Sequence, residues 1–585
     1  MTTSSRLPAG SRTAPASLRR RLCAPPMPAN LVGGALLMLF IFKVVTTNPF
    51  ASLTTPEGRD DPLERAWRST FVDVSKRSHA YLRGALWDRH PGSYTRNLFA
   101  EQSRYLDLIR HDLQPWKDTG ITQDMVEAAS MLYDKCDGDM IRVQIINGSL
   151  WVHHITERLE GGWYPASLGP GNAAAKGRVP YAILAFMDTL RTFPGQVPDV
   201  DLVLHTADFP CVSRSSWAGA AARVPPPPLL SFQGGRHHLD LPFPDATYWG
   251  HEHQYLQARR CDPWGAPVQG WANQAELLVR KYENVSLLDR IPQAQWRGRT
   301  KDERYPGRDH LRRVFVGCVD ELKAAGRGED AALLNVLSPA LALQDSCDYR
   351  YNVYIESRAY ASNLKQKVVC GSLLVALRTK FWEFFSRGMR PGGEFVELSS
   401  DPNAVCEQVV AVTRDMNAAF GAAYASGQLT SSGETTPLLA RQLKKMRRDK
   451  RLASVLEGSG VTVGARGPAP EVGPPLASGS GGNFSWGSSL MPWEIAANGQ
   501  RFILEHVRMQ DVLLYIRDLL RAYSALQRFQ VAPSANLEGR SVCYSGRLLL
   551  EQFGTPHAGD AKTVEAAYPW LRTFGAGCTE VEGDR

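Results

Sequence analysis

The feature that most constrains this chain is a short apolar run, Val200-Asp-Leu-Val-Leu-His205, followed within three residues by a lone carboxylate, Asp208. The run has the length and composition of a buried strand. About thirty residues after it comes a loop rich in proline and aromatic residues, Gly235–Gly250. A carboxylate just past a buried strand, followed by such a loop, is typical of a small-molecule site at the carboxyl edge of an α/β sheet. The pattern therefore predicts an enzyme.

Strand and helix patterns alternate along the rest of the chain. Residues 140–152 read as a β-hairpin around Asn147-Gly148, because Asn-Gly is the strongest short hairpin signal. Further strands are predicted at 351–355 and 371–375, and helices at 181–191 and around the apolar face of 513–526. Such alternation indicates an α/β architecture.

Length and charge narrow the class of protein. A chain of 585 residues is too long for one core, so two or three domains are expected. The net charge is +8, yet no acidic residue precedes Glu57, and six of the 67 basic residues lie before it. The remaining 61 basic residues nearly balance 59 acidic ones. A nucleic-acid-binding protein would carry its excess charge on a folded face, so this class is not favoured.

The basic N-terminal tail leads into an apolar segment. Twelve uninterrupted apolar residues, 31–42, precede Lys43, and the stretch 27–47 is long enough for a thin membrane if Lys43 extends towards a headgroup. We expect a cytoplasmic tail at 1–30, an uncleaved signal anchor at 31–47 and a stem at 48–105, with a cleavable signal peptide as the alternative. The chain would then be a single-pass type II membrane protein of the Golgi or endoplasmic reticulum, its catalytic region lumenal. Two features of the sequence agree with a lumenal location. They are three Asn-x-Ser sequons, at Asn147, Asn284 and Asn483, and ten cysteines.

The composition changes between residues 425 and 490. A basic octet, 444–451, is followed by a stretch rich in Gly, Pro, Ser and Ala at 458–489. We expect a flexible insertion there, with the octet in a solvated loop.

A site that transfers a sugar from a diphosphate donor needs a general base for the acceptor hydroxyl and cations, or a metal, for the leaving group. Two Asp-x-Asp pairs, Asp137/Asp139 and Asp199/Asp201, are weak metal candidates, since two carboxylates at this spacing often arise by chance. Four histidines could suggest a zinc site: His237, His238, His251 and His253. They have neither a cysteine nearby nor the His-x-x-x-His spacing of a helical zinc site. A surface loop is the better interpretation, and no metal is expected.

Basic and hydroxyl side chains offer a metal-free alternative. Arg297 and Arg299 flank a glycine, and a second group follows the strand predicted at 351–355: Arg358, Ser362, Asn363 and Lys365. Taken alone, each is more often a solvated surface residue. Their shared position after strands allows them to converge on a diphosphate.

Several separate blocks of the sequence resemble one known family. They are 113–127, 201–210, 239–250, 296–298, 349–356, 369–373 and 499–502, which together span about 106–530 without the insertion. In this order they resemble the capsule-associated, Rumi-type protein O-glucosyltransferases of glycosyltransferase family 90, and look closest to the plant and algal branch. The resemblance implies a GT-B-like α/β fold of two Rossmann-like domains facing a cleft. It implies an inverting, metal-independent enzyme that uses a UDP-sugar as co-substrate and no cofactor.

The resemblance also implies roles for individual residues. Asp208 matches the catalytic base. Donor-binding positions are Trp249, Arg260, Arg297, Arg358, Tyr360, Ser362, Asn363 and Lys365. Acceptor-loop positions are Phe243, Asp245 and Tyr248. Cys347 and Cys370 match a cysteine pair that is disulfide-bonded in animal members. The acceptor-side half would cover 106–250 and the donor-side half 251–424 and 491–530, with a C-terminal extension at 531–585.

Two departures from the family pattern leave alternatives open. Asn363 stands where animal members have an arginine, which plant-type members also lack. Asp262 replaces a second arginine of the family, for which Arg260 could substitute. A non-catalytic lumenal binding protein that keeps the fold is therefore the second hypothesis. A metal-dependent transferase that uses Asp137 and Asp139 is the third. The expected partners are a UDP-sugar, a protein, N-glycan or polysaccharide acceptor, and a membrane, with no nucleic acid. Neither the donor sugar (glucose or xylose) nor the acceptor follows from the sequence.

Overall fold

The computed structural model describes residues 103–134, 136, 140–155, 178–217, 225–251, 270–298, 300, 310–337, 346–357, 359–432, 437–457, 459, 486–532, 542–553 and 561–575. All of them belong to one of the two compact units into which the chain divides, Ser78–Ala258 with Ala266–Arg585. The predicted tail, the anchor and the stem up to residue 102 lie outside the described residues. Within the described part, no helix is long and apolar enough to cross a membrane.

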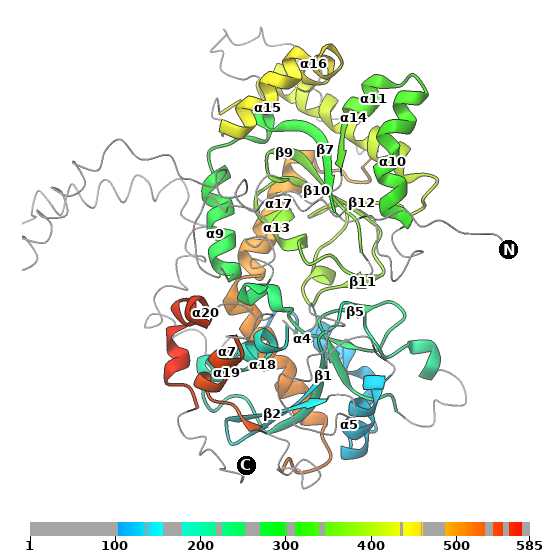
Figure 1. Ribbon diagram of the computed structural model, residues 1–585. Helices are drawn as coiled ribbons and strands as arrows, with labels where there is room; N and C mark the ends of the chain where they lie inside the picture. Colours follow the sequence, from blue (N-terminus) through cyan, green and yellow to red (C-terminus); the bar gives the residue numbers. More distant parts are fainter. Residues whose placement is uncertain are drawn as a thin grey trace, which may run out of the picture. The chain divides into compact units, whose positions relative to one another are not determined.

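The first sheet has six strands in the order β13-β2-β1-β3-β4-β6. Their bounds are β1 Met140–Ile146, β2 Ser149–Ile155, β3 Val200–His205, β4 Leu229–Ser231, β6 Leu241–Pro242 and β13 Val542–Cys543. β1 and β2 form the predicted hairpin (Figure 1), and Asn147 and Gly148 both have positive φ, 50° and 76°, as its tight turn requires. β3, β4 and β6 are parallel, so their carboxyl ends lie at one edge.

The second sheet has five parallel strands in the order β12-β10-β9-β7-β8. Their bounds are β7 Ile291–Arg297, β8 Leu334–Leu337, β9 Tyr349–Tyr354, β10 Leu373–Leu377 and β12 Val396–Leu398. The sequence predicted β9 and β10 but not β7. Polar residues interrupt the apolar pattern of β7, and two of them, Gln293 and Gln295, are buried. A two-stranded ladder, β5 Gly234–Gly235 with β11 Phe381–Trp382, joins the loop after β4 to the segment after β10.

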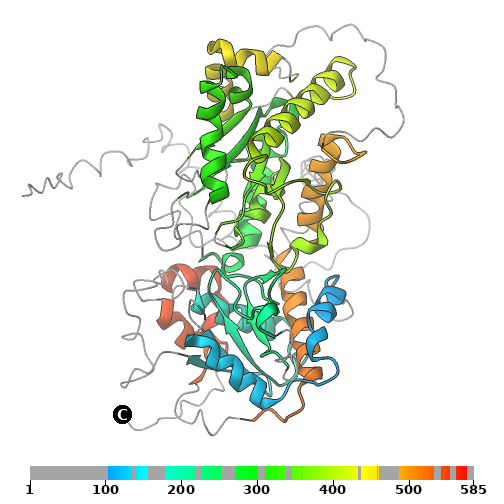
Figure 2. The same cartoon turned by 90° about the vertical axis from the view of Figure 1, so that its right-hand side faces the viewer.

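Helices cover both sheets. Those in contact with the first sheet or its neighbouring helices are α4 Leu106–Asp112, α5 Gln123–Ser130, α7 Val179–Thr192, α18 Met509–Leu526, α19 Gly546–Phe553 and α20 Ala561–Ala567. α7 is buried along almost its whole length, and α4 lies beside α18 (Figure 2). Those around the second sheet are α9 Trp271–Tyr282, α10 His310–Ala324, α11 Gly328–Ala332, α13 Leu364–Val369, α14 Val405–Ala425 and α17 Pro492–His506.

Two helices occupy part of the segment expected to be a flexible insertion. α15 Pro437–Arg448 contacts β7, and α16 Lys450–Glu457 contacts α11. The physical reason is that Met446, Val455 and Leu456 bury their side chains while the basic side chains of 444–448 remain exposed. Most of the Gly/Pro/Ser-rich stretch lies outside the described residues.

The C-terminal part of the chain belongs with the first sheet. β13 pairs with β2, and α19 packs on α7. α18 was expected in the donor-side half, but its contacts are with α7, β3 and α4. The chain therefore returns to the first sheet after α17.

One glycine tests how closely α17 packs against the segment between β11 and β12. A Cβ at Gly499 would lie 2.5 Å from the backbone oxygen of Glu394, which cannot move as a flexible side chain can. We expect Gly499→Ala to lower the free energy of unfolding by about 1–3 kcal/mol. The matched control is Gly317→Ala in α10, whose Cβ would meet only the side chain of Glu321 at 3.4 Å. The control should be neutral or stabilising by up to about 1 kcal/mol in urea denaturation. Equal effects of the two substitutions would contradict this account.

Candidate active site

The loops that follow the carboxyl ends of strands in both sheets meet around Tyr360. Its backbone N–H donates to the side-chain oxygen of Gln233, after β4, at 2.9 Å. Its hydroxyl donates to Asp245, after β6, at 2.7 Å. Tyr360 itself follows β9, so a single residue ties the carboxyl edges of the two sheets together. Sites in α/β proteins lie at such edges.

Asp208 follows β3 at this edge and keeps an accessible carboxylate. Its side chain is 46% exposed and forms an ion pair of 2.6 Å with Arg178. Arg178 also donates to the backbone oxygen of Thr206 at 3.2 Å. Burial lowers the pKa of the Arg178 guanidinium, but the hydrogen bond to Asp208 and the negative charges of Asp208 and Asp245 outweigh that effect, so this pKa is raised and the cation persists. Asp208 is thus held in place by a permanent positive charge, while nearly half of its side chain stays accessible to a hydroxyl group of a bound molecule.

The loop that carries Asp208 is fastened on its far side. Cys211 forms a disulfide with Cys136, with a Cα–Cα distance of 5.6 Å. The Asp240 carboxylate accepts from the backbone N–H groups of Cys211 at 2.7 Å and Val212 at 2.8 Å, and from the hydroxyl of Ser231 at 2.7 Å. Burial raises the pKa of Asp240 to about 6, against the opposing effect of these hydrogen bonds. The sequence alone predicted no role for these residues.

Aromatic rings line the side of the loop next to Asp208. The ring of Phe209 makes edge contacts with His238 at 5.2 Å and Phe381 at 5.3 Å. Burial, and to a smaller degree the neighbouring His237, lowers the pKa of His238 to about 4. His251 packs against Tyr181, and burial lowers its pKa to about 3. Both side chains are therefore neutral at neutral pH. A surface loop was expected here, and His237 is exposed, but His238 is only partly exposed and His251 is buried, because their rings pack against aromatic neighbours.

Three cationic side chains gather at the carboxyl ends of β7 and β9. Arg297 ends β7 and donates to the Asn335 side chain at 2.5 Å. Arg312, on α10, donates to the backbone oxygens of Ile355 at 3.0 Å and Glu356 at 2.8 Å. Lys367, on α13, donates to the backbone oxygen of Val353 at 2.5 Å. Burial lowers the pKa of Lys367 to about 7, and repulsion from Arg312 and Arg297 adds to the effect. A bound polyanion would relieve this repulsion.

The comparison with known families adds the decisive observation. The sequence profile of glycosyl transferase family 90 matches residues 100–420 and 487–545. The chain belongs to glycosyl transferase family 90. The segment between the two matched ranges contains α15 and α16.

This family 90 glycosyltransferase has curated relatives in animals. O-glucosyltransferase rumi of Drosophila melanogaster is 22% identical over 439 residues, which are 74% of this chain and 80% of the relative. The protein of the same name in Drosophila pseudoobscura pseudoobscura is 23% identical over 442 residues, 75% of this chain and 81% of the relative. Human protein O-glucosyltransferase 1 is 25% identical over 222 residues, 36% of this chain and 52% of the relative.

In the family 90 chain, several residues expected to contact ligands lie in the core instead. Trp249 is fully buried and its indole N–H donates to Asp188 at 3.3 Å. Phe243 stacks on Phe186 at 4.9 Å, and Tyr248 is also fully buried. Their side chains support the loop from behind, because large aromatic rings gain most from burial. Only a close approach of the backbone would let this loop touch a ligand.

Lys365 is also buried, at the centre of a polar network. Its ammonium donates to the Thr247 hydroxyl at 2.6 Å and the Ser362 backbone oxygen at 3.0 Å. The carboxylates of Asp245 and Glu383 lie 3.9 and 4.0 Å away. The ammonium also lies 4.3 Å from the centre of the Tyr248 ring. Lys365 therefore ties the segment that follows β6 to the start of α13, a positioning role in contrast to the expected contact with the donor.

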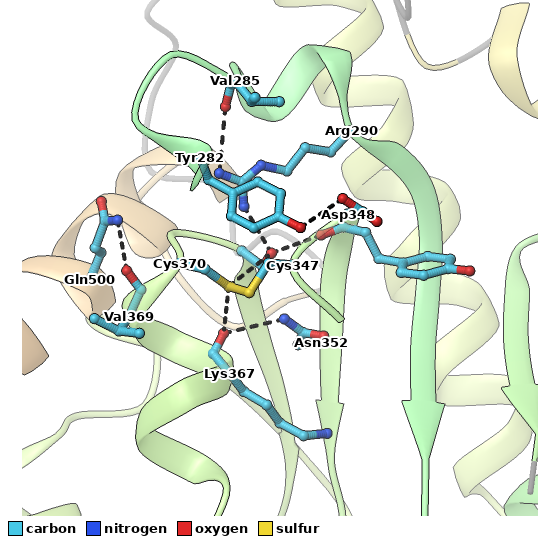
Figure 3. Close-up of a disulfide and its surroundings, with 12 residues drawn as sticks. Tyr282, Val285, Arg290, Cys347, Asp348, Asn352, Lys367, Val369, Cys370 and Gln500 are labelled. Atoms are coloured by element: carbon cyan, nitrogen blue, oxygen red, sulfur yellow. Dashed lines mark hydrogen bonds between the residues drawn. A yellow bond between two sulfur atoms is a disulfide. The ribbon is translucent and has the colours of Figure 1, made fainter. Parts of the chain in front are cut away.

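The disulfide between Cys347 and Cys370 fixes α13 at its other end (Figure 3). This is the pair that the resemblance implied, with a Cα–Cα distance of 5.8 Å. Beside it, Asn352 donates to the backbone oxygen of Lys367 at 3.2 Å, and Gln500 to that of Val369 at 2.8 Å. The helix that carries both lysines is thus held by a covalent bond and by hydrogen bonds from β9 and α17.

The remaining predicted site residues divide into two groups. Asn363 and Ser362 lie at the start of α13, with Asn363 directly before the first helical residue. Arg260, Arg358, Arg299, Asp262, His253 and the pair Asp137/Asp139 lie outside the described residues. Of the second Asp-x-Asp pair, Asp199 accepts the N–H of Asn147 at 2.7 Å, and Asp201 pairs with Arg142 at 2.7 Å. These two carboxylates serve the hairpin and the sheet.

Glu356, directly after β9, should make stability depend on pH. It accepts the N–H groups of Lys380 and Phe381, both at 2.7 Å, yet burial raises its pKa from 4.5 to about 7. Because the folded pKa exceeds the unfolded one, its contribution is fully present below pH 4.5 and is lost as the pH rises through 7. Relative to Glu356→Gln, the wild-type free energy of unfolding should fall by up to about 3 kcal/mol across this window. Urea titrations at several pH values measure the difference; a constant difference would rule this out.

Proposed function

We propose that this protein is an inverting, metal-independent transferase that moves a glucosyl or xylosyl group from a UDP-sugar to a hydroxyl of a glycoprotein, glycan or polysaccharide. The observation that carries the proposal is Asp208, a half-exposed carboxylate held by Arg178 at the meeting edges of the two sheets. The two Drosophila relatives are named O-glucosyltransferases, which supports this reaction class.

In the proposed reaction Asp208 takes the proton of the acceptor hydroxyl as its oxygen attacks the anomeric carbon. The bond between that carbon and the diphosphate oxygen breaks on the opposite face, which inverts the anomeric configuration. Arg297, Arg312 and Lys367 would neutralise the departing UDP, the role that a metal ion has in other transferases. Arg178 would stabilise Asp208 before transfer, and the Phe209 and Phe381 rings would exclude water.

We also propose the finer features that the resemblance implied. The two sheets would be the two Rossmann-like halves of a GT-B-like enzyme, anchored in the Golgi or endoplasmic reticulum membrane through residues 31–47. The plant and algal branch is proposed because Asn363 stands at the end of the donor loop. If Asn363 and Asp262 instead mark a lost activity, the protein would bind a UDP-sugar without turnover.

The test is release of UDP by the purified chain with a panel of UDP-sugars, with and without EDTA. Candidate acceptors would be a protein domain, an N-glycan and a polysaccharide. EDTA-resistant release with one sugar, and a product whose anomeric proton shows inversion by NMR, is the expected result. Loss of activity in EDTA that added metal restores would refute the metal-independent mechanism. If no UDP is released, calorimetry with each UDP-sugar shows whether the protein still binds a donor. A protein that binds a donor is an enzyme if a further acceptor then produces turnover, and a binding protein if no acceptor does.

Arg178 provides a sharper check on the base. Arg178→Gln removes the ion pair to Asp208 and the hydrogen bond to Thr206, so the carboxylate loses its fixed position. We expect the turnover number to fall by about 10–100-fold with little change in KM for the donor. Arg191→Gln is the matched control, since Arg191 lies near the other end of α7 and pairs with Asp188. Equal kinetics for Arg178→Gln and the control would remove Arg178 from the mechanism.

A further inference from the structure

Two thiols outside the candidate site lie on neighbouring helices that cover the second sheet. Cys318 lies on α10 and Cys406 at the start of α14, and these two helices pack together. Neither cysteine is in a disulfide, and the two thiols are near enough for each to shift the pKa of the other. Cys318 is fully buried in the apolar core of this sheet, and Cys406 is partly buried against it.

The other cysteines show the redox state in which the chain folds. Five of the seven described cysteines are disulfide-bonded: Cys136, Cys211, Cys347, Cys370 and Cys543. Such bonds persist in oxidising compartments, where two thiols in contact do not stay reduced for long. The other two described cysteines, Cys318 and Cys406, are not in a disulfide.

We propose that Cys318 and Cys406 are a redox modification site that closes to a further disulfide, linking α10 to α14 across 88 residues of sequence. The oxidant is an external disulfide of a small thiol or of an oxidoreductase. Cys406, the more accessible thiol, loses its proton and attacks one sulfur of that disulfide, releasing one thiolate. Cys318 then loses its proton, attacks the sulfur of Cys406 and releases the second thiolate. The chain loses two electrons and two protons, and the external disulfide becomes two thiols.

The electrostatics of the pair agree with this order. The hydrogen bond from Cys318 lowers the pKa of the Cys406 thiol, whereas the same contact and burial raise that of Cys318. Cys406 is therefore the attacking thiolate and Cys318 the resolving thiol. The bond would fasten α10, whose Arg312 supports the cationic cluster, to the long helix α14. Its role would be to stabilise the donor-side sheet, independently of whether the transfer reaction proposed above is correct.

Peptide mapping of the full-length chain, produced in a secreting eukaryotic cell and extracted in detergent, tests the proposal. Free thiols are blocked with N-ethylmaleimide in denaturant without reductant, and the digest is analysed by mass spectrometry. The expected result is a linked peptide pair that contains Cys318 and Cys406 and disappears on reduction. The Cys347–Cys370 link in the same digest is the internal control. Both thiols carrying the maleimide while that control remains linked would overturn the proposal.

A variant gives an independent readout. In Cys406→Ser, Cys318 should be a free thiol that reacts with the maleimide only when the protein is unfolded. The melting temperature of this variant should be lower by about 5 °C or more, because a disulfide that closes a long loop stabilises strongly. Cys318→Ala should lower it by a similar amount, and the double variant by no more than either alone. Additive effects of the two substitutions would contradict a shared bond.

Discussion

Replacing Asp208 by Asn should abolish sugar transfer while leaving the fold and donor binding intact. The substitution keeps the size of the side chain but removes the group that accepts the proton, so the rate should fall by about 10³-fold or more. Asp208 is 46% exposed, and its ion pair with Arg178 is not part of the core. The melting temperature should therefore change little. The affinity for UDP should stay the same, since the cationic cluster lies on the other sheet.

The measurement is single-turnover transfer with the best donor, together with UDP affinity by calorimetry. Asp199→Asn is the matched control, because Asp199 is an exposed aspartate at the opposite end of the same strand, where it accepts the N–H of Asn147. The control should keep full activity. An Asp208→Asn protein with near-normal turnover would remove Asp208 as the base, and loss of UDP affinity would show that the two sites are not separate.

Locally coded parts of the fold were predictable from the sequence. The turn at Asn147-Gly148 needs only its own backbone conformations, both of which have positive φ, and the strand at 200–205 needs only an apolar run of the right length. The helical face of 513–526 follows from apolar residues that recur every three or four positions, a pattern that lies entirely within the segment. The strand β7 was missed because its buried glutamines depend on partners elsewhere, such as the backbone oxygen of Ala332 for Gln293.

In the candidate site, too, features that depend on local sequence could be predicted, whereas features that depend on distant partners could not. Asp208 could be chosen from its place after a strand, but Arg178 could not, because it lies before a helix and meets Asp208 only in the folded chain. Cys136 and Cys211 are 75 residues apart, and nothing in their spacing selects this pairing. Trp249 lies in the segment after β6 and Lys365 at the start of α13, both of which the family resemblance assigns to the ligand. Whether a loop presents a side chain or its backbone depends on packing, and here packing buries both side chains.

Replacing Lys365 by Met should have the largest effect on stability. Its ammonium is fully buried, with the carboxylates of Asp245 and Glu383 at 3.9 and 4.0 Å and the Thr247 hydroxyl at 2.6 Å. Removing the cation leaves two buried acidic groups without its charge, a change that typically costs about 3–5 kcal/mol. Methionine fills a similar volume, so the loss should reflect charge and hydrogen bonds more than a cavity. Lys444→Met, at an exposed position on α15, is the matched control and should lie within about 0.5 kcal/mol of wild type.

A second substitution separates the charge effect from general damage to the loop. If the uncompensated carboxylate of Asp245 causes the loss, adding Asp245→Asn to Lys365→Met should recover part of it, although Asp245→Asn alone destabilises the wild type through its bonds to Tyr360 and Thr247. Urea denaturation of the four proteins in this cycle gives the coupling energy, expected at about 1–3 kcal/mol. A coupling near zero would mean that Lys365 acts through packing on the Tyr248 ring and not through the acidic pair. The segment after β6 and α13 would then be held together by side-chain packing and not by charge. In that case Lys365→Arg, which keeps the charge but changes the packing, would be as disruptive as Lys365→Met.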